Sequence, residues 1–124
     1  MRDDRGSAAV EFTLVSALLV ALVTGVLQLA LALHVRNTMV SCAAEGARVA
    51  AAGDRSLADG EARTAGMLRD ALGDYEVDVH GFGASVDGAP VVVMSARAPV
   101  PVLGLWGAGS MTVSVRAFEE VDRG

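Results

Sequence analysis

A long uncharged stretch dominates the first third of the chain. From Phe12 to Val35, about 24 residues carry no formal charge, and Gln28 is the most polar side chain among them. At 1.5 Å per residue, a helix of this length measures roughly 36 Å, whereas the hydrocarbon core of a bilayer is about 30 Å thick. A helix in a small soluble protein would not stay apolar on every face over this length. The pattern therefore predicts a transmembrane helix.

Helical character continues beyond the apolar stretch. Residues 36–52 are rich in Ala, a strong helix former, and Gly53 followed by Asp54 is a stop signal. The sequence therefore predicts one long helix that extends to about residue 53, half of it in lipid and half outside.

A second, shorter helix is predicted over residues 56–72. Ser56, with Asp59 three residues later, forms a capping pattern, and Gly73 follows as a C-cap. Apolar residues between these caps recur near helical spacing. Two internal glycines weaken this helix.

From residue 75 onward the period of the apolar residues changes to two, which is typical of strands. Strands are expected over about residues 75–82, 90–98 and 110–118. Asp87 followed by Gly88 is a hairpin signal between the first two. The second strand is apolar enough to lie centrally, and Pro99 interrupts it. Gly81–Gly83 and Gly104–Gly109, the latter containing Trp106, are expected to be loops.

These elements together predict an α+β protein. We expect residues 7–36 to form the transmembrane helix and residues 37–124 a head with a short helix and a three-stranded antiparallel meander. The preceding residues, 1–6, form a short charged segment.

Composition and charge exclude several classes of function. Half of the residues are apolar but only 4% are aromatic, as expected for a membrane helix with a modest head. The net charge of −5 and the scattered arginines argue against nucleic-acid binding, which needs clustered basic residues. The single Cys42 excludes an intramolecular disulfide and a Cys-based zinc site. No catalytic residues, metal ligands or cofactor site are indicated, so an enzyme is not expected.

The most informative residues precede the apolar stretch. Glu11 adjoins this stretch, where a charge is costly, at about 2.5–3.5 kcal/mol if it reaches the bilayer centre and less near the edge. Cleavage after Gly6 would give Ser7 a new α-amino group, four residues before Glu11. One helical turn would then separate the carboxylate from this amine. Glu11 could neutralise its own N-terminus or that of a neighbouring subunit.

In these residues the chain resembles the type IV prepilin-like proteins, and specifically the TadE-like family. Gly6, Glu11 and Phe12 match the leader glycine, the glutamate at the fifth mature position and the aromatic residue after it. Residues 42–51, Cys-Ala-Ala-Glu-Gly-Ala-Arg-Val-Ala-Ala, are similar to the Ala-rich stretch of these proteins. The final strand, Met111–Ala117, is also similar to theirs.

The resemblance implies a minor pilin or pseudopilin of a tight-adherence (Flp-type) pilus or secretion system. Residues 1–6 would be a prepilin leader in the cytoplasm, removed by a prepilin peptidase, and the head would lie outside the membrane. The implied partners are this peptidase, other pilin-like subunits, the pilus assembly platform and membrane lipid. At the first mature position Ser7 replaces the Phe that many type IV pilins carry and N-methylate.

Small residues on two faces of the long helix indicate helix–helix packing. Residues four apart lie on one face, and small side chains let helices approach closely. The residues concerned are Ala17, Ala21 and Gly25 in the apolar part, and Ala43, Ala47 and Ala51 beyond it. Cys42 is expected to be a small packed residue, with an intermolecular disulfide as the alternative.

Other interpretations of the N-terminal region remain open at this stage. The chain could be a signal-anchored binding module whose head recognises an external ligand. It could also be a secreted enzyme released by cleavage at Ala30–Ala32, which fits an A-x-A site, although the apolar stretch is longer than usual for a signal peptide. A lipoprotein cleavage site before Cys42 is disfavoured by Arg36 and Asn37.

Overall fold

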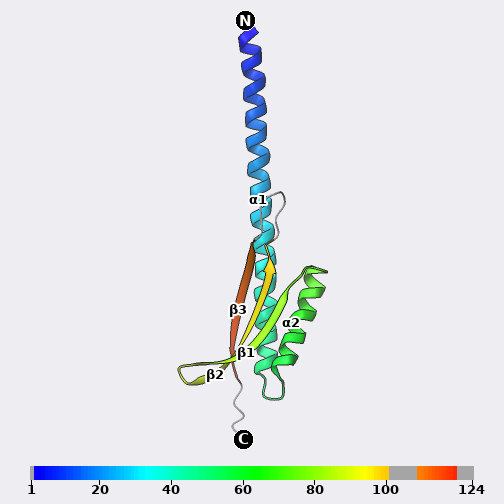
Figure 1. Ribbon diagram of the computed structural model, residues 1–124, viewed down its shortest axis with the longest axis vertical. Coiled ribbons are helices and arrows are strands. Elements are labelled where there is room, and N and C mark those ends of the chain that lie inside the picture. The colour runs from blue at the N-terminus through cyan, green and yellow to red at the C-terminus, as the bar shows by residue number, and fades with distance from the viewer. Residues whose placement is uncertain (1, 101–108, 120–124) are drawn as a thin grey trace.

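The computed structural model describes residues 2–100 and 109–119, with side chains from Asp4 onward. It consists of one long helix and a small head that packs along the C-terminal half of that helix (Figure 1). The helices are α1 (Arg2–Ala51) and α2 (Leu57–Leu72), and the strands are β1 (Asp78–Val86), β2 (Ala89–Pro99) and β3 (Ser110–Phe118). The predicted α+β fold, with a short helix and a three-stranded antiparallel sheet, is confirmed.

The long helix begins earlier than the apolar pattern indicates. α1 starts at Arg2, so the charged segment continues the helix that was expected from Phe12. Gly6 is the only glycine in this segment, which has no proline, and one internal glycine costs a helix only about 1 kcal/mol. α1 ends at Ala51, two residues before Gly53.

The second helix has the caps that the sequence indicates. The hydroxyl of Ser56 accepts a hydrogen bond from the backbone N–H of Asp59 at 3.2 Å, and the carboxylate of Asp59 accepts one from the N–H of Ser56 at 2.9 Å. Gly73 ends α2 at φ 67°, where its N–H bonds the carbonyl of Arg69.

The three strands form an antiparallel sheet in the order β1-β2-β3, so β2 is central, as its apolar composition predicts. Asp87 and Gly88 form the two-residue turn between β1 and β2, with φ values of 50° and 81°. Positive φ at both positions is what a type I′ hairpin requires.

β1 differs from its predicted position at both ends. It starts at Asp78 instead of about residue 75, because the hydroxyl of Tyr75 donates a hydrogen bond to the carbonyl of Pro99. Pro99 has no backbone N–H that could donate a hydrogen bond to an extension of β1. The expectation of a loop at Gly81–Gly83 is wrong, since these residues lie within β1, which continues to Val86.

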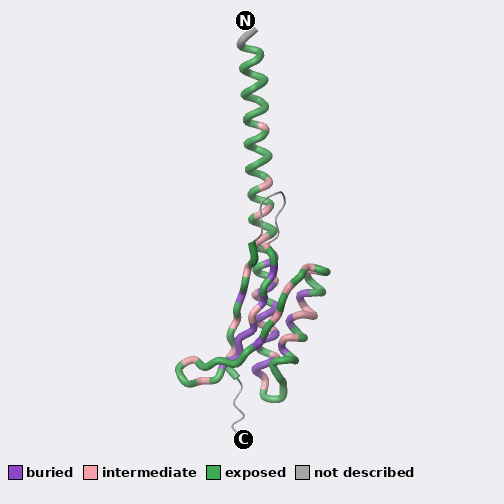
Figure 2. The backbone as a smooth tube through the Cα atoms, viewed as in Figure 1, coloured by how far each residue is buried: buried purple, intermediate pink, exposed green. Residues whose placement is uncertain are grey.

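The core lies between the sheet, α2 and the C-terminal half of α1, as the buried residues in Figure 2 show. One cluster surrounds Met39 and Leu68, and the other contains the alanines of α1 with Val92 and Met94 of β2. The expected loop around Trp106 lies outside the described residues, apart from Gly109.

Candidate membrane-anchoring and assembly segment

The N-terminal half of α1 leaves its large apolar side chains uncovered by the rest of the chain. Every large apolar residue from Val10 to Leu33 is exposed, from 37% at Leu31 to 75% at Phe12. Figure 2 shows this half as a bare rod above the head. Among the described residues, α1 is the one helix long and apolar enough to cross a membrane, and none of its apolar window is buried. This arrangement is consistent with a single-pass membrane protein.

Thr13, a polar residue of the bare half, is compatible with lipid. The hydroxyl of Thr13 donates a hydrogen bond to the carbonyl of Ala9 at 2.9 Å, within the same helix. Such a bond satisfies the hydroxyl without water, as a hydrocarbon environment requires. The helix supplies the remaining backbone hydrogen bonds itself.

The predicted processing and assembly residues lie on the first turns of α1, away from the head. Ser7, Glu11 and Phe12 are all exposed, and no atom lies within 4 Å of the position that a Cβ on Gly6 would take. Ser7 and Glu11 are four residues apart in continuous helix, so they lie one above the other on one face. The structure therefore leaves this segment open to an enzyme or a neighbouring subunit.

The first predicted packing face lies bare. Ala17, Ala21 and Gly25 are exposed, and a Cβ at Gly25 would meet nothing within 4 Å. A second helix could approach α1 closely along this face without displacing any part of the chain.

The second predicted packing face lies in the protein's own core. Ala43 and Ala47 have no exposed surface, and Ala51 is 7% exposed. They form one cluster with Val92 and Met94 of β2, which rests on this side of α1. Small side chains here let a sheet approach the helix.

A close crossing of α1 and α2 is a feature that sequence reasoning missed. A Cβ at Gly46 would collide with the side chain of Thr64 and lie 2.7 Å from the carbonyl oxygen of Gly60. A Cβ at Gly60 would lie 2.5 Å from both the carbonyl oxygen of Gly46 and the Cβ of Ala50. Gly60 therefore permits α2 to pack closely against α1, although a glycine inside a helix lowers the stability of that helix. The small residues at positions 60 and 64, four apart, were the available signal.

Cys42 lies in the core cluster with Met39 and Leu68, and is 4% exposed. Burial raises the pKa of its thiol, because the thiolate would lose solvation.

His34 and His80 are exposed, and His80 contacts Phe82, with 6.2 Å between the ring centroids. Within residues 2–100 and 109–119, no group of three or more His, Cys, Asp or Glu residues could hold a metal ion.

Comparison with known protein families gives a match over the N-terminal part of the chain. The sequence model of the family described as TadE-like protein matches residues 6–48. The match begins at Gly6 and covers the bare half of α1 and the alanines at the start of the core, so the resemblance is confirmed over this segment. Over these residues the chain is similar to TadE-like proteins. Searches of curated proteins and of solved structures found no match.

Proposed function

We propose that this TadE-like protein is a minor pilin or pseudopilin of a tight-adherence pilus or secretion system, anchored by α1 and assembled through it. The family match, which begins at Gly6 and runs along the exposed apolar helix, carries this proposal. On this proposal the N-terminus lies in the cytoplasm and the head lies outside the membrane.

Processing would take place at the peptide bond between Gly6 and Ser7. A prepilin peptidase hydrolyses this bond with water, which leaves a carboxylate on Gly6 and an ammonium group on Ser7. The absence of a side chain at Gly6 and the exposure of both residues support access by the enzyme. The protein is the substrate in this step.

Glu11 would then serve as the partner of the new ammonium group. One helical turn separates the two groups within one chain, and a neighbouring chain could bring its own ammonium group to the same carboxylate. The carboxylate also favours the positive end of the helix dipole. An unpaired carboxylate at the membrane boundary would cost free energy, so pairing with the ammonium group of a neighbouring chain would favour a subunit docked beside another.

Lateral assembly would use the bare half of α1. Phe12, which is 75% exposed, lies next to Glu11, and the face formed by Ala17, Ala21 and Gly25 lies deeper in the membrane. Helices associate in lipid through close packing of such small residues, because lipid chains provide no hydrophobic drive between helices. Other pilin-like subunits and the assembly platform are the proposed partners.

Replacing Glu11 with Gln tests this function. E11Q keeps the size of the side chain and removes its charge, so membrane insertion and cleavage after Gly6 should persist while pilus assembly falls. The matched control is E45Q, because Glu45 lies on the same helix but forms a local ion pair with Arg48 at 3.3 Å.

Assembly is measured as the amount of pilus-associated protein recovered by shearing, alongside the level of the protein in the membrane. Normal assembly with E11Q would contradict the proposed role. It would favour a signal-anchored binding module, which has no use for a carboxylate at this position.

A further inference from the structure

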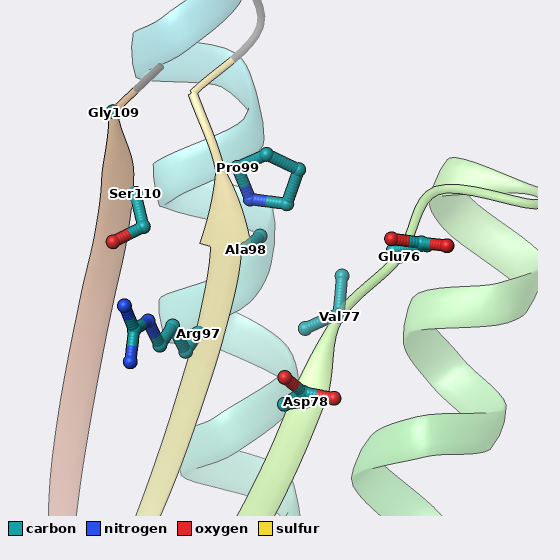
Figure 3. A pocket seen from close by; sticks show the side chains of 8 residues that line it. All are labelled: Glu76, Val77, Asp78, Arg97, Ala98, Pro99, Gly109 and Ser110. Atoms are coloured by element: carbon teal, nitrogen blue, oxygen red, sulfur yellow. The ribbon is translucent and has the colours of Figure 1, made fainter.

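The head contains an open hollow at the end that faces the bare half of α1. Its volume is about 860 Å³, and the ends of all three strands contribute to it. Figure 3 shows Glu76 and Asp78 on the β1 side, Arg97 and Pro99 on β2, and Ser110 at the start of β3. In Figure 1 the ends of β2 and β3 at this hollow lie beside the part of α1 where the bare rod begins.

The position of this hollow along α1 follows from the packing of the core. Leu33 is 49% exposed and ends the bare apolar stretch, whereas Val35 is 3% exposed. Val35 belongs to one core cluster with Ala98 of β2 and Val113 of β3. Because the head packs onto α1 at Val35, the last residue of the uncharged stretch, no linker separates the head from the bilayer.

The depth of the charged side chains can be estimated from this shared cluster. The polar layer on each side of a bilayer is about 5–7 Å thick, since total thickness is about 40–45 Å and the hydrocarbon core about 30 Å. Arg97 is the residue next to Ala98 and pairs with Asp78 across the sheet. At about 3.3 Å per residue along a strand, both lie within the headgroup layer.

The charges in the hollow complement one class of headgroup. Glu76, Asp78 and Arg97 are exposed, and in the described part of the chain none of them forms an ion pair within 4.0 Å. A guanidinium group binds a phosphate through paired hydrogen bonds, and carboxylates accept hydrogen bonds from a primary ammonium group. A phosphoethanolamine headgroup carries both of these charges a few bonds apart.

We propose that this hollow binds the headgroup of a zwitterionic aminophospholipid, with the phosphate on Arg97 and the ammonium group on Glu76 and Asp78. Such a contact holds the head against the membrane surface. The inference rests on α1 crossing the membrane, and it does not depend on cleavage after Gly6 or on pilus assembly.

Lipid retention tests the chemistry of the site. The full-length protein is released from nanodiscs that contain equal parts of phosphatidylethanolamine and phosphatidylcholine, and the bound lipids are identified by native mass spectrometry. Phosphatidylcholine has the same phosphate but a quaternary ammonium group that donates no hydrogen bonds. We expect the wild-type protein to retain phosphatidylethanolamine in preference to phosphatidylcholine. Because both lipids carry the phosphate, R97Q should lower the retained amount of each by about fivefold, the upper range for one exposed ion pair.

The matched control is R116Q. Arg116 is exposed on β3 and pairs with Val93, four residues along β2 from Arg97, so it lies about 13 Å farther from the membrane. R116Q should leave retention unchanged. Equal retention of the two lipids, or equal losses with R97Q and R116Q, would overturn the proposal.

A depth measurement tests the position of the hollow without altering its charges. In a Cys42→Ala background, a fluorophore is attached at S110C, on the rim of the hollow, or at S85C, in the hairpin at the other end of the sheet. A quencher on the lipid headgroups should quench the label at position 110 and not that at position 85. Equal, weak quenching at both positions would place the head away from the bilayer and contradict the proposal, whatever the result of N-terminal processing.

Discussion

Gly46 and Gly60 determine how closely the two helices of the head can pack. Each glycine faces the backbone of the other helix, at distances that a Cβ atom could not occupy. Backbone atoms cannot move aside as the end of a flexible side chain can. This crossing places α2 against α1, which lets the sheet cover the remaining side of the helix.

We predict that G46A destabilises the head by about 1–3 kcal/mol, the usual range for overpacking a well-packed site. G66A is the matched control, because a Cβ at Gly66 on α2 would meet nothing within 4 Å. Alanine there should be neutral or stabilise the helix by up to about 1 kcal/mol. Urea unfolding of the full-length protein in detergent, followed by circular dichroism, gives both free energies. Equal effects of the two substitutions would show that the crossing is loosely packed.

Cys42 should react slowly in the folded protein. Burial raises the pKa of its thiol and restricts access, so little thiolate is available at neutral pH. We expect alkylation by iodoacetamide to be at least about tenfold slower than in urea, and non-reducing gels to show no disulfide-linked dimer.

The sign of the pH effect on Cys42 follows from this shift. Above the ordinary thiol pKa, the unfolded chain loses its proton before the folded one, so this thiol lowers stability only at alkaline pH. Rapid alkylation of the native protein at pH 7, or a dimer in the absence of reductant, would contradict the buried position.

At the scale of helices and strands, local signals predicted the ends of most elements. The capping box at Ser56, the C-cap at Gly73 and the hairpin at Asp87-Gly88 all depend on residues within a few positions of one another. Their geometry is therefore contained in the local sequence. The central position of β2 also followed from its apolar run.

The errors arose where a distant contact decides the structure. Gly81 lies in β1 because α2 passes over it, and the carboxylate of Glu61 accepts a hydrogen bond from its N–H at 2.9 Å. A Cβ at Gly81 would lie 3.1 Å from the end of Met94. β1 likewise begins late because Tyr75 bonds to Pro99, 24 residues away. Neither contact is visible in a local pattern.

The capping box of α2 gives a prediction for both mutation and pH. S56A removes the hydroxyl that accepts the N–H of Asp59 and should cost about 1 kcal/mol. The control is S85A, since Ser85 is exposed on β1. Urea unfolding of the three proteins at pH 7 measures the difference, and equal stability of S56A and S85A would contradict the cap.

The pKa of the Asp59 carboxyl is lowered by two hydrogen bonds from Ser56. The bond from the backbone N–H has the larger effect, and the bond from the hydroxyl the smaller one. A lowered pKa in the folded state means that the carboxylate stabilises the head above the ordinary Asp pKa of about 4 and loses this effect as the pH falls through the folded value. D59N should therefore reduce the fall in stability between pH 5 and pH 3. An unchanged pH profile would exclude this role.

At the scale of the whole molecule, α1 divides into a bare half and a half covered by the head. The apolar stretch predicted the bare half, because a helix that carries no charge over this length is typical of a membrane span. The alanine spacing predicted packing on both halves but could not identify the packing partner. Ala43, Ala47 and Ala51 face the chain's own sheet, and the corresponding face around Ala21 is open.

The bare face allows a clean test of association between subunits. A21L and G25L add side chains where nothing lies within the same chain, so the head should fold normally while co-purification with other pilin-like subunits falls several-fold. The control is A30L, because Ala30 is exposed on the opposite side of the helix by the 100° rotation per residue. Unchanged co-purification with A21L and G25L would show that subunits associate through another surface.

The mature N-terminus tests the central claim most directly. Intact mass and N-terminal sequencing of the protein, with and without the prepilin peptidase, distinguish a processed pilin from a plain membrane anchor. We predict a chain that begins at Ser7 only when the peptidase is present. A chain that keeps residues 1–6 both with and without the peptidase would contradict the proposal that the protein is a processed pilin.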